Sequence, residues 1–216
     1  MHKILIFGGG SKFGLHLSNE FSNLKCEVEI VTSSTLENLP FKQYKIDWLT
    51  LDRTTIQKLC KQFQDIDVII FNQNYSQINQ LENISVSQLD MMGNLKKLAQ
   101  GHFVNCELAL QVCNSLYVNK KFKKNAKAVW MLSESIDSSS YVSLEYRLQK
   151  YTNYQFVNYI NNSKILNCVG IYPGKIHETD YAIKAKNLAN FLTNKISDTT
   201  EPYYTFNDKH MVMVKK

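Results

Sequence analysis

The 216-residue sequence lacks the features that mark membrane, secreted and zinc-dependent proteins. No stretch approaches roughly 18 consecutive apolar residues, so no membrane span is expected. The apolar run ILIF at 4–7 is too short for a signal peptide and leads straight into a glycine loop. The five cysteines are widely spread, with no C-x-x-C pair and no cysteine–histidine cluster at metal-ligand spacing. These absences predict a cytoplasmic protein with reduced thiols and no metal site.

The sequence also has no large block of charge of one sign. The net charge is +6, but the lysines are scattered, and the densest run is KKFKK at 120–124. We interpret this run as a solvated helix end and turn, because a nucleic-acid surface needs a broader basic patch. The length and the ordinary hydrophobic content predict one globular domain over residues 1–216, with no nucleic-acid partner.

Short apolar runs alternate with stretches that have helical spacing. The runs are KILIF (3–7), VEIV (28–31), DVIIF (67–71), KAVWML (127–132) and ILNCVGIY (165–172), with YKID (44–47) as a weaker candidate. Between the first two runs, Phe13, Leu17 and Phe21 recur at the spacing of one helix face. Strands this apolar are expected in a parallel sheet that is covered on both faces. The predicted fold is therefore α/β, a doubly wound parallel sheet (Rossmann fold) with three layers.

Glycine and proline are scarce, with eight and three residues, yet four of the glycines fall within seven positions. They lie in FGGGSKFGL (7–15), after the first expected strand and before the first expected helix. A dinucleotide site needs glycines there for a tight turn and for close approach of the pyrophosphate. A Walker A loop is excluded because no Gly-Lys-Ser/Thr follows, and Phe13 interrupts a strict G-x-G-x-x-G. The loop predicts nucleotide binding, with a purely structural turn as the alternative.

A second candidate motif is YRLQK, which places Tyr146 and Lys150 four residues apart, on one face of a helix. With 12 tyrosines and 23 lysines in the chain, chance alone produces such a pair about once. Tyr117 and Lys121 form a second copy. The pair by itself therefore does not distinguish a catalytic site from an ordinary helix surface.

The spacing of several motifs gives the pair a context. Gly8 and Gly14 are six residues apart, and Ser133, at the end of the fifth expected strand, lies 13 residues before Tyr146. In these spacings the chain resembles the short-chain dehydrogenase/reductase family, with its T-G-x-x-x-G-x-G loop and its Ser, Tyr and Lys. Lys12 replaces the middle glycine of that loop. The other copy fails this test, because Val104 lies 13 residues before Tyr117.

Further landmarks follow in the order of the family. Asp47 ends the third expected strand and Trp48 follows it, where the family has an Asp whose side chain and following amide hold the adenine ring. FNQN (71–74) stands where the family has N-N-A-G, and only Asn72, at its second position, matches. Asn105 lies in the long central helix that carries the family's catalytic Asn. Pro173-Gly174 ends the sixth expected strand, as the P-G beside the nicotinamide does. The resemblance spans residues 3 to about 192.

The resemblance implies roles for four residues. Tyr146 would be the acid/base, Lys150 would lower the Tyr pKa and hold the nicotinamide ribose, Ser133 would position the substrate oxygen, and Asn105 would support a proton-relaying water. A phenol ordinarily has a pKa of about 10. An ammonium about 4 Å away, at an effective dielectric of about 20, contributes on the order of 4 kcal/mol, which is enough to bring it near neutrality. The alternatives are a surface tyrosine and a locally satisfied helix asparagine.

The predicted cofactor contacts combine the glycine loop, the ends of the strands and the catalytic pair. They are Gly8, Gly10, Ser11, Lys12, Phe13, Gly14, Thr32, Ser33, Asp47, Trp48, Asn72, Tyr146, Lys150, Pro173 and Gly174. Thr32 and Ser33 occupy the end of the second expected strand, where NAD enzymes usually carry an acidic residue. Small hydroxyls and Lys12 suit a 2′-phosphate, which favours NADP(H) over NAD(H), although no arginine follows the strand.

The chain also departs from the family pattern. Only about five residues separate Pro173-Gly174 from the next helical stretch, TDYAIKAKNLANFL, so the substrate lid is short or missing. Residues 75–101 are long by comparison and are expected to shape the substrate entrance. A poorly covered pocket suits a bulky or macromolecule-attached substrate.

The predicted function is hydride transfer between NAD(P) and a small-molecule carbonyl or alcohol. Two alternatives are a dinucleotide-binding regulator without turnover, and a sugar-nucleotide epimerase or dehydratase, which the short C-terminal half opposes. A homodimer through the helices of Asn105 and Tyr146 is also predicted. Its support is the row Leu144, Leu148, Tyr151 and Gln155, for which core packing is the alternative.

Overall fold

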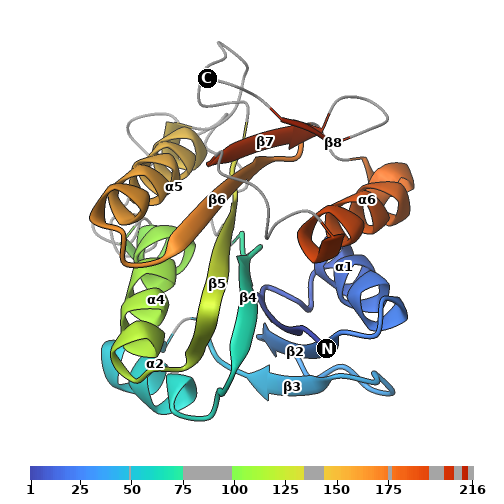
Figure 1. The fold of residues 1–216 in the computed structure, drawn as a ribbon. Coiled ribbons are helices and arrows are strands. Elements are labelled where there is room, and N and C mark those ends of the chain that lie inside the picture. The colour runs from blue at the N-terminus through green and yellow to red at the C-terminus, as the bar shows by residue number, and fades with distance from the viewer. Residues whose placement is uncertain are drawn as a thin grey trace, which may run out of the picture.

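The computed structural model describes residues 1–48, 50–74, 99–133, 144–174, 177–194, 202–206 and 211–213. Its strands are β1 (Lys3–Phe7), β2 (Glu27–Thr32), β3 (Lys42–Lys45), β4 (Ile66–Phe71), β5 (Phe122–Met131), β6 (Asn167–Tyr172), β7 (Tyr203–Phe206) and β8 (Met211–Met213). They form one sheet in the order β3-β2-β1-β4-β5-β6-β7-β8. Strands β1 to β7 are parallel, and β8 pairs antiparallel with β7 (Figure 1).

Helices cover both faces of the sheet. Figure 1 shows α2 (Arg53–Cys60), α4 (Leu108–Val118) and α5 (Leu144–Ser163) on one face, and α1 (Lys12–Asn23) and α6 (Tyr181–Asn194) on the other. A π-helical turn, η3 (Phe103–Glu107), leads into α4, and a short 3-10 turn, η5 (Glu178–Asp180), leads into α6. The predicted doubly wound α/β fold with three layers is confirmed.

The apolar runs became strands because their side chains are buried on both faces. In β1, Ile4 and Ile6 pack in the core beneath α1 and α6, whereas Leu5 and Phe7 pack in the core beneath α2, α4 and α5. A strand between two hydrophobic layers needs apolar residues at every position, which a continuous run such as ILIF provides. The parallel arrangement brings the carboxyl ends of the strands to one edge of the sheet.

All six predicted strands are present, and the described residues include two further strands that were not predicted. The missed strands β7 and β8 are only four and three residues long. The KKFKK run was partly misassigned: α4 ends at Val118, and β5 begins at Phe122, inside the run. The first residues of β5 extend beyond the buried part of the strand, so lysines there remain solvated. In the part of the chain that the structure describes, no helix is long and apolar enough to cross a membrane.

Candidate active site

The glycine loop joins β1 to α1 at the carboxyl edge of the sheet. Ser11 caps the helix, because its Oγ accepts a hydrogen bond from Gly14 N at 3.0 Å. Gly8 has a φ of +76°, and a Cβ there would lie 2.7 Å from Gln73 N. A Cβ on Gly14 would overlap the Gly8 carbonyl oxygen. Glycine is therefore required at both predicted positions by the close approach of neighbouring backbone.

A cavity of about 300 Å³ opens beside this loop. Its lining is Gly8, Gly10, Ser11, Thr32, Ser33, Ser34, Trp48, Asn72, Gln73 and Asn74. Seven of these residues are predicted cofactor contacts, while Ser34, Gln73 and Asn74 were not predicted. The lining consists of backbone amides, hydroxyls, carboxamides and one indole, without a carboxylate among the described residues. A larger cavity, of about 790 Å³, lies elsewhere and is lined by residues of α2, α4 and α5.

The segment after β4 connects the glycine loop to the central helix. Asn72 Nδ2 donates to Gly8 O at 3.3 Å and to Ser11 Oγ at 3.0 Å. These two hydrogen bonds link the end of β4 to both sides of the glycine loop. The next residue, Gln73, donates through Nε2 to Val104 O at 3.3 Å in η3. The chain has Gln73 at the third position of the family's N-N-A-G, and here its side chain links the segment after β4 to η3.

Several predicted cofactor contacts do not line the cavity. Lys12 is exposed at the start of α1, and Asp47 is exposed, with Oδ2 accepting from Thr50 Oγ1 at 3.1 Å. The Phe13 side chain is buried and packs against Tyr181, with the two ring centroids 5.9 Å apart, so it belongs to the core beneath α1 and α6. These residues lie near the cavity without forming its wall.

Pro173 and Gly174 follow β6 directly at the carboxyl edge. Pro173 O accepts a hydrogen bond from Lys184 Nζ at 2.9 Å, and Gly174 has a φ of +66°. Because Lys184 belongs to α6, this bond ties the P-G turn to the helix that follows it. The link between them is short, as predicted, with the 3-10 turn η5 leading into α6. Residues 175–176, most of 75–101 and 134–143 lie outside the described part, so the predicted entrance is not described.

The candidate catalytic pair lies at the start of α5. Lys150 Nζ is 5.5 Å from the centroid of the Tyr146 ring, and it donates to Met131 O at 2.8 Å. Met131 is the last residue of β5, and Ser133 follows it two residues later, half-buried. The hydrogen bond therefore fastens the first turns of α5 to the strand end that carries Ser133.

Lys150 is the only buried ionisable group of the predicted catalytic set. Burial lowers the pKa of its ammonium to about 8, and the nearby Cys106 thiol acts weakly in the opposite direction. Among the described residues, no carboxylate forms an ion pair with it. Lys150 is therefore charged below about pH 8 and increasingly neutral above it.

Asn105 lies in the π-helical turn and is 5% exposed. Its Nδ2 donates to Gln149 Oε1 at 2.8 Å, and Gln149 precedes Lys150 in α5. The Asn105 carbonyl oxygen accepts from Asn153 Nδ2 at 3.0 Å. All four predicted catalytic residues are thus connected through α5 and the end of β5.

Sequence reasoning missed Gln73, Gln149 and Asn153. A signal for two of them was present in α5, because Tyr146, Gln149, Lys150 and Asn153 have the i, i+3, i+4, i+7 spacing of one helix face. A polar stripe on a helix face that packs inward marks a site rather than a core. Gln73 had no comparable signal.

Solved structures with this architecture include several oxidoreductases that have low sequence identity to the chain. A carbonyl reductase from Pseudomonas aeruginosa has a TM-score of 0.70 and 16% identity, over 91% of this chain and 93% of that one. A short-chain dehydrogenase/reductase from Brucella ovis, in complex with a partially ordered NAD, has a TM-score of 0.74 and 14% identity, over 95% and 99%. An alcohol dehydrogenase from the archaeon Thermococcus sibiricus, complexed with 5-hydroxy-NADP, has a TM-score of 0.72 and 11% identity, over 95% and 96%.

No family model and no curated protein matches the sequence. At these identities the likeness to solved structures establishes the fold. The chain has the Rossmann fold of the short-chain dehydrogenases/reductases, with which it aligns over nearly its whole length. The resemblance predicted from the glycine loop and YRLQK is confirmed at the level of the fold.

Proposed function

We propose that the chain is a divergent short-chain dehydrogenase/reductase, an NAD(P)-dependent oxidoreductase that interconverts a carbonyl and an alcohol. One observation carries the proposal: Tyr146 and Lys150 are fastened to the end of β5, at the same sheet edge as the glycine-loop cavity. Ligands of open α/β sheets bind at this edge. The solved structures with this fold include complexes with NAD and 5-hydroxy-NADP, which supports the same class of cofactor here.

The residues around the cavity fit a dinucleotide. The first turn of α1 is capped by Ser11 and begins directly after the glycines, so its free amides suit a pyrophosphate. Trp48 supplies an aromatic surface and Thr32 and Ser33 supply hydroxyls for the adenosine half. Pro173-Gly174 follows β6 at the same edge and would border the nicotinamide. When bound, the nicotinamide would supply or accept the hydride.

Side chains of this protein would supply the proton that carbonyl reduction requires. Tyr146 would donate a proton to the carbonyl oxygen as that oxygen gains charge, and the Ser133 hydroxyl would hold the oxygen in place. The charged Lys150 ammonium, over the Tyr146 ring, would stabilise negative charge that develops on the phenol oxygen as the proton leaves. Because Lys150 loses its charge above about pH 8, carbonyl reduction is expected to decline above that pH.

The proposed cofactor is NADP(H). Thr32, Ser33 and Ser34 form the wall of the cavity at the end of β2, where an NAD enzyme usually offers a carboxylate. Lys12 is exposed at the start of α1, on the adjoining loop. Titration of NADPH and NADH by their fluorescence tests this proposal, with tighter NADPH binding expected. Ser33→Asp should reverse the preference, and a clear NADH preference in the wild type would refute it.

The activity is tested by comparing two tyrosines. NADPH oxidation is followed with a panel of aldehydes, ketones and quinones for wild type, Tyr146→Phe and the matched control Tyr117→Phe. We expect about a thousandfold loss in Tyr146→Phe, from the size of general acid catalysis, with unchanged NADPH affinity. Tyr117→Phe should retain full activity, since Tyr117 is 49% exposed on α4.

The outcomes also separate the enzyme from a regulator without turnover. Equal activity of wild type and Tyr146→Phe would refute the assigned role of Tyr146. A wild type that binds NADPH tightly but reduces nothing in the panel would favour the regulator.

We further propose a homodimer through the outer face of α5. Leu148 and Tyr151 are 56% and 51% exposed, Gln155 is exposed, and Tyr159 continues the row at 63%. Core packing therefore does not account for these apolar side chains, whereas a second copy would bury them. The Leu144 side chain lies outside the described part. Sedimentation velocity should show a dimer that Tyr151→Glu dissociates, and a wild type that is monomeric at tens of micromolar would refute the proposal.

A further inference from the structure

Three buried carboxamides surround the π-helical turn that carries Asn105. Gln73 is 8% exposed, and Gln149 and Asn153 are each 4% exposed. They come from the segment after β4 and from α5, far apart in the sequence. Burying a carboxamide is unfavourable unless it forms hydrogen bonds, and all three form them with η3 or with Asn105 itself.

The π-helical geometry explains two of these bonds. Leu108 N donates to Phe103 O, five residues earlier, where an α-helix would use Val104 O, four residues earlier. Val104 O accepts instead from Gln73 Nε2 at 3.3 Å. The next carbonyl, Asn105 O, accepts from Asn153 Nδ2 at 3.0 Å. Side chains of other segments thus satisfy two consecutive carbonyls where the helical ladder changes its register.

The third carboxamide, Gln149, acts on the Asn105 side chain. Its Oε1 accepts from Asn105 Nδ2 at 2.8 Å, and its main-chain oxygen accepts from Cys106 Sγ at 3.4 Å. With its nitrogen directed at Gln149, the Asn105 carboxamide must direct its oxygen elsewhere. The terminal torsion of an asparagine is broad and roughly two-fold, so this bond selects one of the two orientations.

We propose that Gln149 is a positioning residue that fixes the orientation of the Asn105 carboxamide. The proposal rests on the proposed function, in which Asn105 supports a proton-relaying water. Gln149 is adjacent to Lys150, and Lys150 bonds Met131 O at the end of β5. A single turn of α5 therefore has two effects. Gln149 sets the orientation of the Asn105 carboxamide, and Lys150 places the ammonium at the end of β5.

The kinetic test uses Gln149→Met, which keeps the length of the side chain and removes the acceptor. With NADPH and the best carbonyl substrate of the panel, we expect kcat to fall about tenfold, while KM and NADPH affinity stay within twofold. Asn105→Ala should lower kcat similarly, and the double variant should be no slower than Asn105→Ala alone. Gln57→Met, on the exposed face of α2, is the matched control and should behave as wild type.

The conservative variant Gln149→Glu adds a second measurement, the pH dependence of the rate, which would not change if Gln149 were purely structural. Gln149→Glu keeps an oxygen acceptor for Asn105, so kcat should recover to within about threefold of wild type. A carboxylate beside Lys150 favours the charged ammonium, so the alkaline limb of the rate profile should move to higher pH. Wild-type kcat in Gln149→Met, or fully additive losses in the double variant, would overturn the proposal.

A second measurement does not depend on turnover. The Asn105 side-chain amide protons, assigned in NMR spectra by their absence from Asn105→Ala, should exchange slowly in wild type and in Gln57→Met. In Gln149→Met they should exchange at least tenfold faster. Unchanged exchange would overturn the positioning role even if activity changed. If the wild type shows no turnover but the exchange result holds, the proposed function fails and the positioning of Asn105 stands.

Discussion

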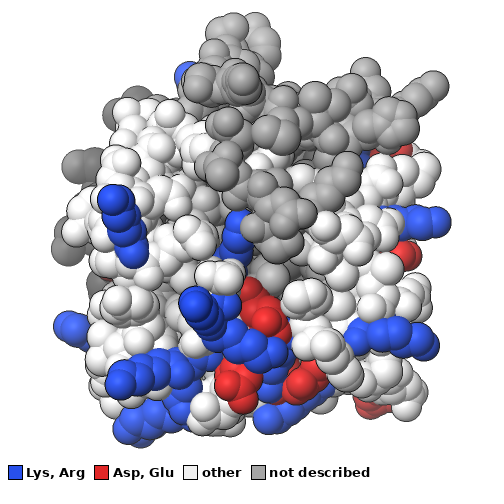
Figure 2. Space-filling view, viewed as in Figure 1, with Lys and Arg blue, Asp and Glu red and all other residues white. Residues whose placement is uncertain are grey.

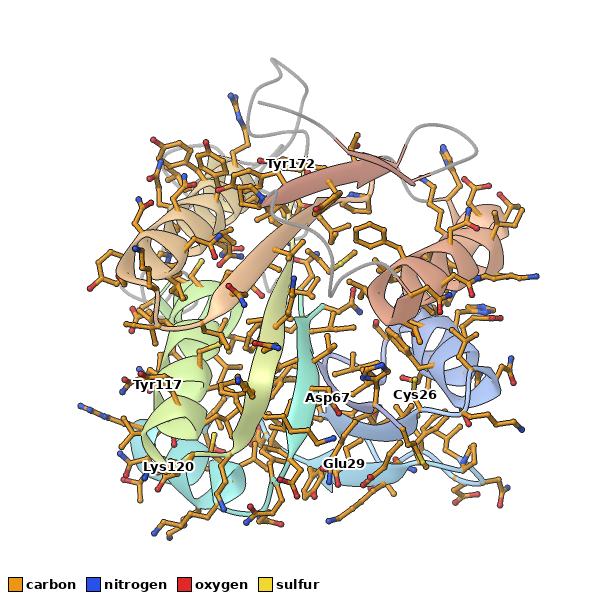
Figure 3. All side chains as sticks on the ribbon, viewed as in Figure 1. Cys26, Glu29, Asp67, Tyr117, Lys120 and Tyr172 are labelled. Carbon is orange, nitrogen blue, oxygen red and sulfur yellow. The ribbon has the colours of Figure 1, made fainter. Side chains whose placement is uncertain are left out.

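The two edges of the sheet are built from different chemistry. At the amino edge, Lys3 Nζ lies 3.0 Å from both Glu27 and Glu29, and Lys123 Nζ lies 2.7 Å from Asp67. Figure 3 labels Glu29 and Asp67 at this lower edge and Tyr172 at the opposite edge. Figure 2 shows charged side chains gathered over the same lower region. The carboxyl edge, by contrast, offers glycines, hydroxyls and carboxamides around the cavity.

The two edges also differ in the partners that they provide for a buried charge. Glu29 is 3% exposed, but it is paired with Lys3 and accepts from Tyr44 OH at 3.1 Å. Lys150 is 8% exposed; it donates to Met131 O and lies over the Tyr146 ring, and no carboxylate among the described residues pairs with it. At the amino edge, removing one partner of a pair would leave the other charge uncompensated and destabilise the fold. At the carboxyl edge, the ammonium has no ionic partner among the described residues, so it lowers stability and keeps a titratable group available for chemistry.

The two edges also differ in where they use glycine. At the carboxyl edge the left-handed positions are Gly8 and Gly174. At the amino edge, the turns that enter β2, β5 and β6 place Lys25, Lys120 and Lys164 in the left-handed region, with φ of 61°, 54° and 53°. A lysine there is less favourable than glycine, although its charge suits the C-terminal end of a helix. Glycine is concentrated where backbone must approach backbone.

The largest effect is expected for Gly8→Ala at the carboxyl edge. The new Cβ would lie 2.7 Å from Gln73 N at a positive φ, so unfolding free energy should fall by about 4 kcal/mol from strain and overlap. NADPH affinity should fall at least a hundredfold. Lys25→Ala, which also places alanine at a positive φ, is the control and should leave NADPH binding unchanged. Wild-type NADPH affinity in Gly8→Ala would contradict the assignment of the loop.

A smaller effect, confined to stability, is expected for Glu29→Gln at the amino edge. Lys3 would lose one of its two carboxylates while remaining largely buried, and breaking such a pair costs about 3 kcal/mol. Urea denaturation measures the loss, and NADPH affinity should stay within twofold of wild type. A large loss of NADPH affinity would show that the two edges are not separate in function.

Lys150→Met should stabilise the protein while removing its activity. Burial lowers the pKa of Lys150 from 10.5 to about 8, so at pH 7 the folded state carries an unfavourable charge, and its removal should add about 2 kcal/mol. Between about pH 8 and 10.5 the folded wild type binds fewer protons than the unfolded chain, so wild-type stability rises with pH in that window. The advantage of the variant should therefore shrink across the window. A variant less stable than wild type at pH 7 would contradict this account.

The smallest effect is expected for Lys164→Gly in the turn between α5 and β6. Removing the side chain at a φ of 53° should raise unfolding free energy by about 0.5–1 kcal/mol. Asn162→Gly, two residues earlier and within α5, is the control and should lower it by a similar amount. Thermal unfolding measures both, and a loss of stability in Lys164→Gly would show that the lysine contributes more than its backbone strain.

Much of the fold followed from local patterns. Runs such as ILIF and VIIF predict strands buried on both faces, and the glycines of FGGGSKFGL mark the crossing from β1 to α1. The link between Ser133, Tyr146 and Lys150 also came from spacing, and the hydrogen bond of Lys150 to Met131 O places them at one strand end.

The rest depends on contacts between distant segments. The π-helical turn has no sequence pattern of its own, because its carbonyls are satisfied by Gln73 and Asn153, 31 and 48 residues away along the chain. Strand β7 is short, and it gains its place through Tyr203, whose ring stacks on Tyr154 of α5 at 5.1 Å. Neither arrangement can be read from a window of neighbouring residues.

The π-helical turn also determines the effect of inserting or deleting a single residue at this point of the chain. One extra residue in a helix rotates everything before it by about 100° relative to everything after it. Residues 103–107 therefore set the phase between α4, which packs on the sheet, and the chain that enters it from residue 99. Deleting one residue there would restore an ordinary helix and re-aim that incoming segment without disturbing a strand. Because the strands of the sheet do not include this turn, a change of one residue here would act on the entering chain and on its bonds to α5 rather than on the pairing of the strands.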